Sequence, residues 1–261
     1  MEHVDGTAPL NRSGPAGGAV KAKRALILAR EIVDDIETNA QGPGDRLPQE
    51  EEMLARYDVA RATLREALRF LELQGVIYLQ PGRGGGPVVS RPQTANFASS
   101  MALILQFMDT DLAALLDLRE AIAPTVAERA AKNATLADLA ALEDCFARLD
   151  REREAPTFEE TNRRFHDLLG WASGNPTFGL LTSALHLLTR SMSHGLGFSK
   201  QERETQLRCL AQVLHAVRVR DAAGARRHME RLTAGSTRYL TERSPDVVAQ
   251  KVRWENASRD A

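Results

Sequence analysis

The residues with the clearest chemistry lie near the start of a predicted helix at residues 61–74. Apolar residues recur in this segment at intervals of three and four, which predicts a helix with one buried face. These residues are Leu64, Ala67, Leu68 and Leu71. Arg61, Thr63 and Arg65 are expected on or near the opposite, exposed face. Because arginine can donate two hydrogen bonds to guanine or to a phosphate, this face could bind DNA.

The elements around this helix are those of a DNA-binding module. The pattern predicts a supporting helix at 49–57, a turn at 58–60, and a strand at 76–79 after Gly75. A glycine-rich tip follows, in which Gly82, Arg83 and Gly84 could approach a phosphate or a narrow minor groove without side-chain clashes. The alternative is a helical hairpin with solvated arginines, but the whole ordered series favours a winged helix-turn-helix.

The same segment resembles a known family. GDRLPQE at 44–50, LARY at 54–57, VARATLREAL at 59–68 and LELQG at 71–75 are similar to the winged helix of GntR-family transcription regulators. The sequence departs from the family at Glu51, where an arginine is usual, and at Ala60, where serine or threonine is usual. The DNA-binding residues that the resemblance implies are therefore Arg61, Thr63, Arg65, Gly82, Arg83 and Gly84.

Charge alone does not indicate a nucleic-acid-binding protein. The 261 residues carry a formal net charge of −1, and residues 19–91 hold eleven basic and eleven acidic residues. DNA binding would then depend on a few clustered cations and on specific contacts. Such a sparse positive surface favours a homodimer, which would double it.

Composition excludes several classes of protein. The two cysteines, Cys145 and Cys209, are too few for a disulfide framework and predict reduced core residues of a cytoplasmic protein. No apolar run approaches 18 residues, so no membrane span or membrane partner is expected. Residues 1–18 lack the apolar stretch of a signal peptide and are rich in Gly, Pro, Ser and Asn, which predicts a disordered arm.

The second half of the chain is expected to be entirely helical. Aromatic residues make up only 5% of the sequence, so a core of Leu, Ala and Val is expected. A linker at 92–96 precedes an all-helical effector-binding and dimerisation domain of six or seven helices at 97–243, and 244–261 is expected to be a frayed tail. Pro124 is expected to kink one of these helices or to mark an irregular turn. The fold class is therefore mainly α, with a winged helix-turn-helix at 19–91.

This half also resembles a known domain. LDLRE at 116–120, NRRFHDLL at 162–169, SGNP at 173–176 and the spaced residues Ala216, Val217, Asp221, Ala225 and Met229 occur in the order found in the effector domain of FadR-like GntR regulators. The resemblance implies a two-fold DNA operator, usually bound by a repressor, and a small-molecule effector held in the helical domain.

Many domains of this kind hold a divalent metal through an Asp, a His four residues later, and two further His. The corresponding positions here are Asn162, His166, Leu210 and Leu232. Asn is a poor transition-metal ligand and Leu is none, so the site is interpreted as degenerate and no metal cofactor is expected. A cavity lined by leucine in place of histidine favours an effector that has an apolar part or that is fixed by arginine.

Arg119 and Arg190 are the arginines that could hold such an effector. Both lie inside apolar helical patterns, and a buried arginine needs an anionic partner. That partner is either a carboxylate of the bundle, such as Glu120, or the carboxylate of an effector held through two hydrogen bonds. The candidate effector-binding residues are Arg119, Asn162, His166 and Arg190, and the effector class is an organic acid or an acyl-type metabolite.

Nothing in the sequence indicates catalysis. The nucleophile elbow, the phosphate-binding loop and the dinucleotide fingerprint are all missing. The glycine-rich tip at 82–86 is followed by Pro87 and a strand, which argues against a phosphate cradle. The sequence therefore predicts a ligand-responsive transcription regulator and not an enzyme. Two alternatives remain: a metal-binding or enzymatic helical domain with the winged helix as scaffold, or a DNA-binding architectural protein without an effector.

Overall fold

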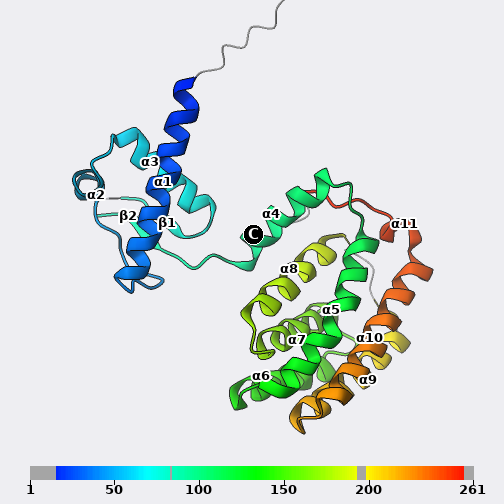
Figure 1. Cartoon of the computed structure of the whole chain (residues 1–261). Coiled ribbons are helices and arrows are strands. Elements are labelled where there is room, and N and C mark those ends of the chain that lie inside the picture. The colour runs from blue at the N-terminus through cyan, green and yellow to red at the C-terminus, as the bar shows by residue number, and fades with distance from the viewer. Residues whose placement is uncertain (1–15, 83, 193–197, 256–261) are drawn as a thin grey trace, which may run out of the picture. The chain divides into compact units, whose positions relative to one another are not determined.

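The computed structural model describes residues 16–82, 84–192 and 198–255 of the chain. It is mainly helical and divides into two compact units, Met1–Gln93 and Thr94–Ala261 (Figure 1).

The first unit is a three-helix module with a two-stranded ribbon. Its elements are α1 (Ala16–Thr38), α2 (Glu50–Tyr57), α3 (Arg61–Leu73), β1 (Ile77–Gln80) and β2 (Gly86–Val89). The two strands pair antiparallel, with Ile77 opposite Val89 and Gln80 opposite Gly86. Apolar residues of α1, α2 and α3 form one core together with Ile77 and Val89. The predicted winged helix-turn-helix is confirmed.

Local backbone geometry explains where these helices end. Asp58, after α2, adopts a left-handed conformation with φ of 47°, and Gly75, after α3, has φ of 74°. Such residues turn the chain out of a helix, and glycine does so without steric cost. The four apolar residues expected on the inner face of α3 are all buried. This fixes the opposite face of the helix toward solvent.

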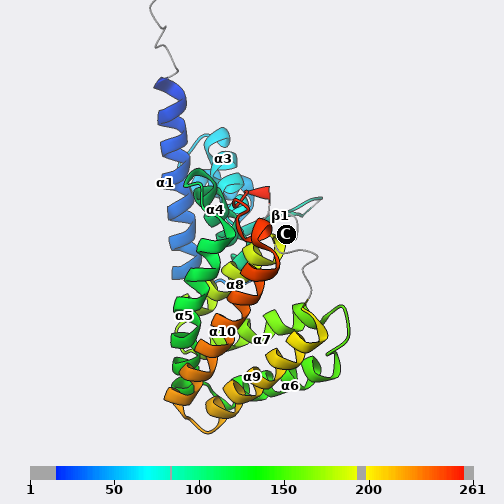
Figure 2. The same ribbon diagram turned by 90° about the vertical axis from the view of Figure 1, so that its right-hand side faces the viewer.

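The second unit is a bundle built around one central helix. Its elements are α4 (Thr94–Phe107), α5 (Leu112–Asn133), α6 (Leu136–Arg151), α7 (Phe158–Ala172), α8 (Pro176–Met192), α9 (Lys200–Arg218), α10 (Ala222–Arg243) and α11 (Pro245–Val248). α5 packs against α7, α8, α9 and most extensively α10. Figure 2 shows α5 and α10 running side by side. The predicted six or seven helices correspond to α4–α10, and the short α11 was not expected.

Two apolar cores hold the bundle together. One joins α5, α6, α7, α9 and α10, and the other joins α4, α5 and α8 with residues that follow α10. Side-chain caps begin several helices: Asp111 caps α5, Ser199 caps α9, and Thr135 forms a capping box with Asp138 at the start of α6. These local signals place the helix starts close to the predicted positions. α5 runs through Pro124 as one helix, without a break at that residue.

The expectation of a frayed tail is wrong for residues 245–255. Val248 and Val252 are buried in the second core. The Val252 N–H donates to the Thr110 carbonyl oxygen at 2.9 Å, and the Trp254 indole N–H donates to Ser99 Oγ at 2.8 Å. The spaced valines provide the apolar contacts that fix this segment against α4 and α5. Residues 256–261 lie outside the described residues.

The N-terminal boundaries also differ from those predicted. α1 begins at Ala16, so the expected arm at 1–18 overlaps the helix, while residues 1–15 lie outside the described part of the chain. α4 begins at Thr94, inside the expected linker at 92–96. Cys145 and Cys209 are both free thiols. None of the described helices is long and apolar enough to cross a membrane.

Candidate DNA interface and effector cavity

The exposed face of α3 carries two arginines that share a carboxylate of α2. The side chains of Arg61 and Arg65 are 57% and 64% exposed. Glu50, the first residue of α2, lies between them, because its Oε1 is 3.4 Å from Arg61 Nε and 3.2 Å from Arg65 Nε. Exposed ion pairs of this kind contribute little stability. The guanidinium groups therefore stay accessible to a partner in solution.

The expectation that Thr63 lies on the exposed face of α3 is wrong. Its side chain is only 5% exposed. Thr63 precedes Ala67 and Leu71 by four and eight residues, and residues four apart lie on the same side of a helix. That spacing can be read from the sequence, and it indicates that Thr63 packs on the buried face of α3.

The wing is tied to the segment before α2. Arg46 donates hydrogen bonds to the Gly84 carbonyl oxygen and, at 2.9 Å, to Gln80 Oε1. Gln49 Nε2 donates to the Gly85 carbonyl oxygen at 3.2 Å. Sequence reasoning missed both Arg46 and Gln49, although Arg46 lies in the motif that suggested the fold.

The predicted wing glycines adopt conformations that favour glycine. Gly82 and Gly84 have φ of 102° and 84°, and the space at each Cβ position is open. A Cβ at Gly85 would instead clash with the Gln80 carbonyl oxygen. The backbone of the tip is therefore accessible on one side. Arg83, also predicted to contact DNA, lies outside the described residues.

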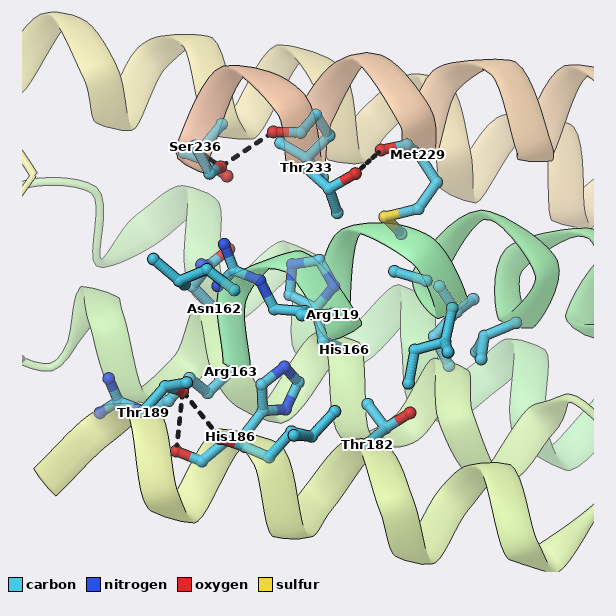
Figure 3. Close-up of a pocket in the computed structure, with 18 of the residues that line it drawn as sticks. Arg119, Asn162, Arg163, His166, Thr182, His186, Thr189, Met229, Thr233 and Ser236 are labelled. Carbon is cyan, nitrogen blue, oxygen red and sulfur yellow. Dashed lines mark hydrogen bonds between the residues drawn. The ribbon is translucent and has the colours of Figure 1, made fainter. Parts of the chain in front are cut away.

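The second unit encloses a cavity of about 100 Å³ between α5, α7, α8, α9 and α10. Most of its lining is apolar, and Leu116, Leu169, Met229 and Leu232 are examples. Figure 3 shows Arg119 and His166 between the α10 residues and the α8 residues. The structure therefore brings together three of the predicted effector residues, Arg119, Asn162 and His166.

Several buried polar atoms in this cavity have no hydrogen-bond partner among the described residues. They are Nε and Nη2 of Arg119, Oδ1 of Asn162 and Oγ1 of Thr182. Burial lowers the pKa of Arg119 from its ordinary value, although the charge of Glu120 opposes that shift. Glu120 makes no hydrogen bond that would satisfy the guanidinium. An unpaired buried charge is costly, so an anionic partner would stabilise the Arg119 guanidinium.

His166 is held in its neutral form. Burial, and then the nearby His186 and Arg119, lower the pKa of His166 well below its ordinary value. The rings of His166 and His186 pack edge to face with centroids 5.7 Å apart. His186 Nδ1 is in turn 2.7 Å from Asp167 Oδ1. A neutral His166 can donate one hydrogen bond and accept one in the cavity.

Arg190 does not line this cavity. It lies in an outer groove of about 720 Å³ between α6, α7 and α8. Arg163, from α7, lines both the groove and the inner cavity, and sequence reasoning missed it. Arg190 follows Leu187 and Leu188, whereas Arg163 follows Thr161 and Asn162, so the spacing of apolar residues could not show which arginine lines the inner cavity.

Comparison with known proteins decides the family. Residues 25–85 match the family model "Bacterial regulatory proteins, gntR family", and residues 114–235 match the model "FCD domain". The chain belongs to the GntR family. Its winged helix and its cavity-bearing bundle are the two matched domains, so this GntR protein is a DNA-binding transcription regulator with an effector-binding domain.

Several relatives of this GntR protein are named as transcription repressors. It is 27% identical over 207 residues to the galactonate operon transcriptional repressor of Escherichia coli, which covers 77% of this chain and 89% of that protein. It is 28% identical over 170 residues to the repressor NanR of Edwardsiella tarda, covering 64% and 65%. A Streptococcus agalactiae GntR structure has the same fold, with a TM-score of 0.65, 21% identity, and coverage of 82% and 99%.

The residues of this GntR protein do not fit the metal found in many FCD domains. Leu232 lines the cavity and Leu210 is fully buried in the adjacent core. His215 and His228 lie outside the cavity, where their Nδ1 atoms contact Arg218 and Arg231. No three His, Cys, Asp or Glu side chains gather to hold a metal anywhere in the described residues. Asn162 and His166 alone provide one amide and one imidazole.

The depressed pKa of His166 predicts a pH-dependent stability. Unfolded His166 would bind a proton near pH 6.5, whereas the folded protein keeps it neutral, so folding stability is lost as pH falls through that value. When the pH falls from 7.5 to 5.5, the free energy of unfolding of wild type should drop by about 1 kcal/mol more than that of His166→Gln. Urea unfolding at each pH provides the measurement. His215→Gln, on an exposed part of α9, should behave as wild type. Equal losses in wild type and His166→Gln would contradict a neutral buried His166.

Proposed function

We propose that this GntR protein is a cytoplasmic homodimeric repressor, released from a two-fold DNA operator by a small carboxylate effector. The observation that carries the proposal is the unpaired guanidinium of Arg119, whose Nε and Nη2 are buried in the cavity without a hydrogen-bond partner among the described residues. A carboxylate can accept two parallel hydrogen bonds from such a group and neutralise its charge. No catalytic step is assigned to the chain.

The size and lining of the cavity support a small acid with an apolar part. A dry engineered cavity of about 150 Å³ holds benzene, so about 100 Å³ suits an effector of only a few carbon atoms. The free oxygens of Asn162 and Thr182 could hydrogen-bond a hydroxyl group of the same molecule. The related Escherichia coli repressor is named for the galactonate operon, and galactonate is a hydroxylated carboxylate.

A homodimer is supported by an apolar surface on α4. Ile104, Phe107 and Met108 are 60%, 85% and 68% exposed. Large neighbouring apolar side chains of this kind mark protein interaction surfaces. A dimer would also present two α3 helices to the half-sites of a two-fold operator, which offsets the weak positive charge of one winged helix.

The effector acts, in this proposal, by selecting one arrangement of the dimer. It can shift that equilibrium only by as much as its affinities for the two arrangements differ. Pairing with Arg119 removes an unpaired charge from the point where α5, α7, α8 and α10 meet. The arrangement in which this pairing is strongest is the one that is released from DNA.

Arg61→Ala should weaken binding to an operator obtained by in vitro selection. Loss of an arginine that contacts a base or a phosphate is expected to cost about 1–3 kcal/mol in binding free energy. Arg151→Ala, on the exposed part of α6, should leave the affinity unchanged. Fluorescence anisotropy at one fixed salt concentration provides the measurement. An unchanged affinity for Arg61→Ala would remove α3 as the recognition helix.

Arg119→Met should stabilise the effector-free protein and abolish its response. Replacing an unpaired buried charge by an apolar side chain of similar length is expected to raise the free energy of unfolding by about 1–3 kcal/mol. The variant should bind the operator normally but fail to release it with any organic acid that releases wild type. Urea unfolding and operator release together test this, with the exposed Arg227→Met as control. Normal release by Arg119→Met would overturn the proposed role of Arg119.

A further inference from the structure

The wall between the inner cavity and the outer groove consists partly of Arg163 and His186. Both residues line the cavity of about 100 Å³ and the groove of about 720 Å³. Arg163 extends from α7 beside Thr189 of α8, as Figure 3 shows. A molecule bound at Arg119 that is longer than the inner cavity would therefore meet Arg163 at the boundary with the groove.

Arg163 has no hydrogen-bond or ion-pair partner among the described residues. It is half-buried, and only burial and the charges of its neighbours act on it. Burial, and next the charge of Arg190, lower the pKa of Arg163, so both effects disfavour its charged form. The guanidinium is thus placed where an added negative charge would relieve repulsion as well as form hydrogen bonds.

The carboxylates near Arg163 are engaged elsewhere or face water. Glu159 Oε1 accepts a hydrogen bond from Arg203 Nη2 at 2.9 Å and another from the Phe198 backbone N–H. Asp167 is paired with His186 at 2.7 Å. Glu160 is exposed to solvent. These groups moderate the charge of Arg163 through space without occupying its donors.

We propose that the effector is a dianion whose first carboxylate binds Arg119 and whose second anionic group binds Arg163 at the boundary between cavity and groove. This inference rests on the proposed function, because it assumes that Arg119 holds a carboxylate. It adds a second anionic subsite, supplied by a different helix. A dianion would also explain why two arginines without partners border one small, largely apolar cavity.

The length of the effector is set by the two arginines. Leu169 and Leu185 are among the apolar residues that line the same cavity, so an apolar middle suits the molecule. Unbranched dicarboxylates of increasing length are therefore suitable probes. Their matched monocarboxylates fill the same space but lack the second charge.

The test is isothermal titration calorimetry on the full-length chain at constant ionic strength. The probes are succinate, glutarate and adipate, each compared with the monocarboxylate of equal carbon number: butyrate, valerate and hexanoate. In wild type, the best dicarboxylate should bind at least about 10-fold more tightly than its monocarboxylate, since its second carboxylate adds a hydrogen bond between charged groups.

Two variants locate the second subsite. Arg163→Gln should remove the advantage of the dicarboxylate and leave monocarboxylate affinity within about two-fold of wild type. Arg227→Gln removes an exposed arginine of α10 that lines neither cavity nor groove, and should leave both affinities unchanged. Thermal unfolding of each variant establishes that it is folded.

The outcomes separate this inference from the proposed function. Equal affinities for mono- and dicarboxylates in wild type would overturn the second subsite and leave the Arg119 carboxylate site standing. A dicarboxylate advantage that survives in Arg163→Gln would also overturn the role of Arg163. Binding of neither series to wild type would overturn both proposals. The comparison within wild type decides the inference even if Arg163→Gln fails to fold.

Discussion

The central constraint on the second unit is a positive charge buried without a partner. Arg119 lies on α5, the helix that contacts most of the bundle, and its Nε and Nη2 are enclosed and unpaired. Leaving a charge in such a place costs several kcal/mol, which the two surrounding apolar cores must offset. An anion that enters the cavity removes this penalty. Effector affinity and bundle stability are therefore two measures of the same interaction.

The side chains next to Arg119 in the cavity leave its guanidinium unpaired. Burial holds the pKa of His166 well below its ordinary value, so in the proposed function it offers hydrogen bonds to the effector without adding a second positive charge beside Arg119. Leucine at 232, where a metal-binding relative would have histidine, leaves arginine side chains as the cationic groups that line the cavity. The first unit uses its arginines differently. Arg61 and Arg65 are exposed and share the carboxylate of Glu50, and the proposed function has them exchange that weak pairing for contacts with DNA.

Much of the fold could be predicted from the sequence because its signals are local. The spacing of Leu64, Ala67, Leu68 and Leu71 gave the buried face of α3, and Thr135 marked the start of α6. Interactions between distant segments could not be predicted. The tail at 245–255 packs through contacts with residues near 110 and 99, and Arg46 reaches the wing tip from 38 residues away. For the same reason, Arg163 was overlooked and Arg190 was placed with the effector residues.

Native mass spectrometry of the untagged full-length protein, purified without chelator, tests the central claim most directly. The account predicts the mass of a dimer without a divalent metal, carrying or readily gaining an organic acid that the Arg119→Met protein does not bind. Retention of about one divalent ion per subunit would contradict the account, because it would mean that Asn162 and His166 still form a metal site. An acid that binds wild type and Arg119→Met equally would contradict it as well.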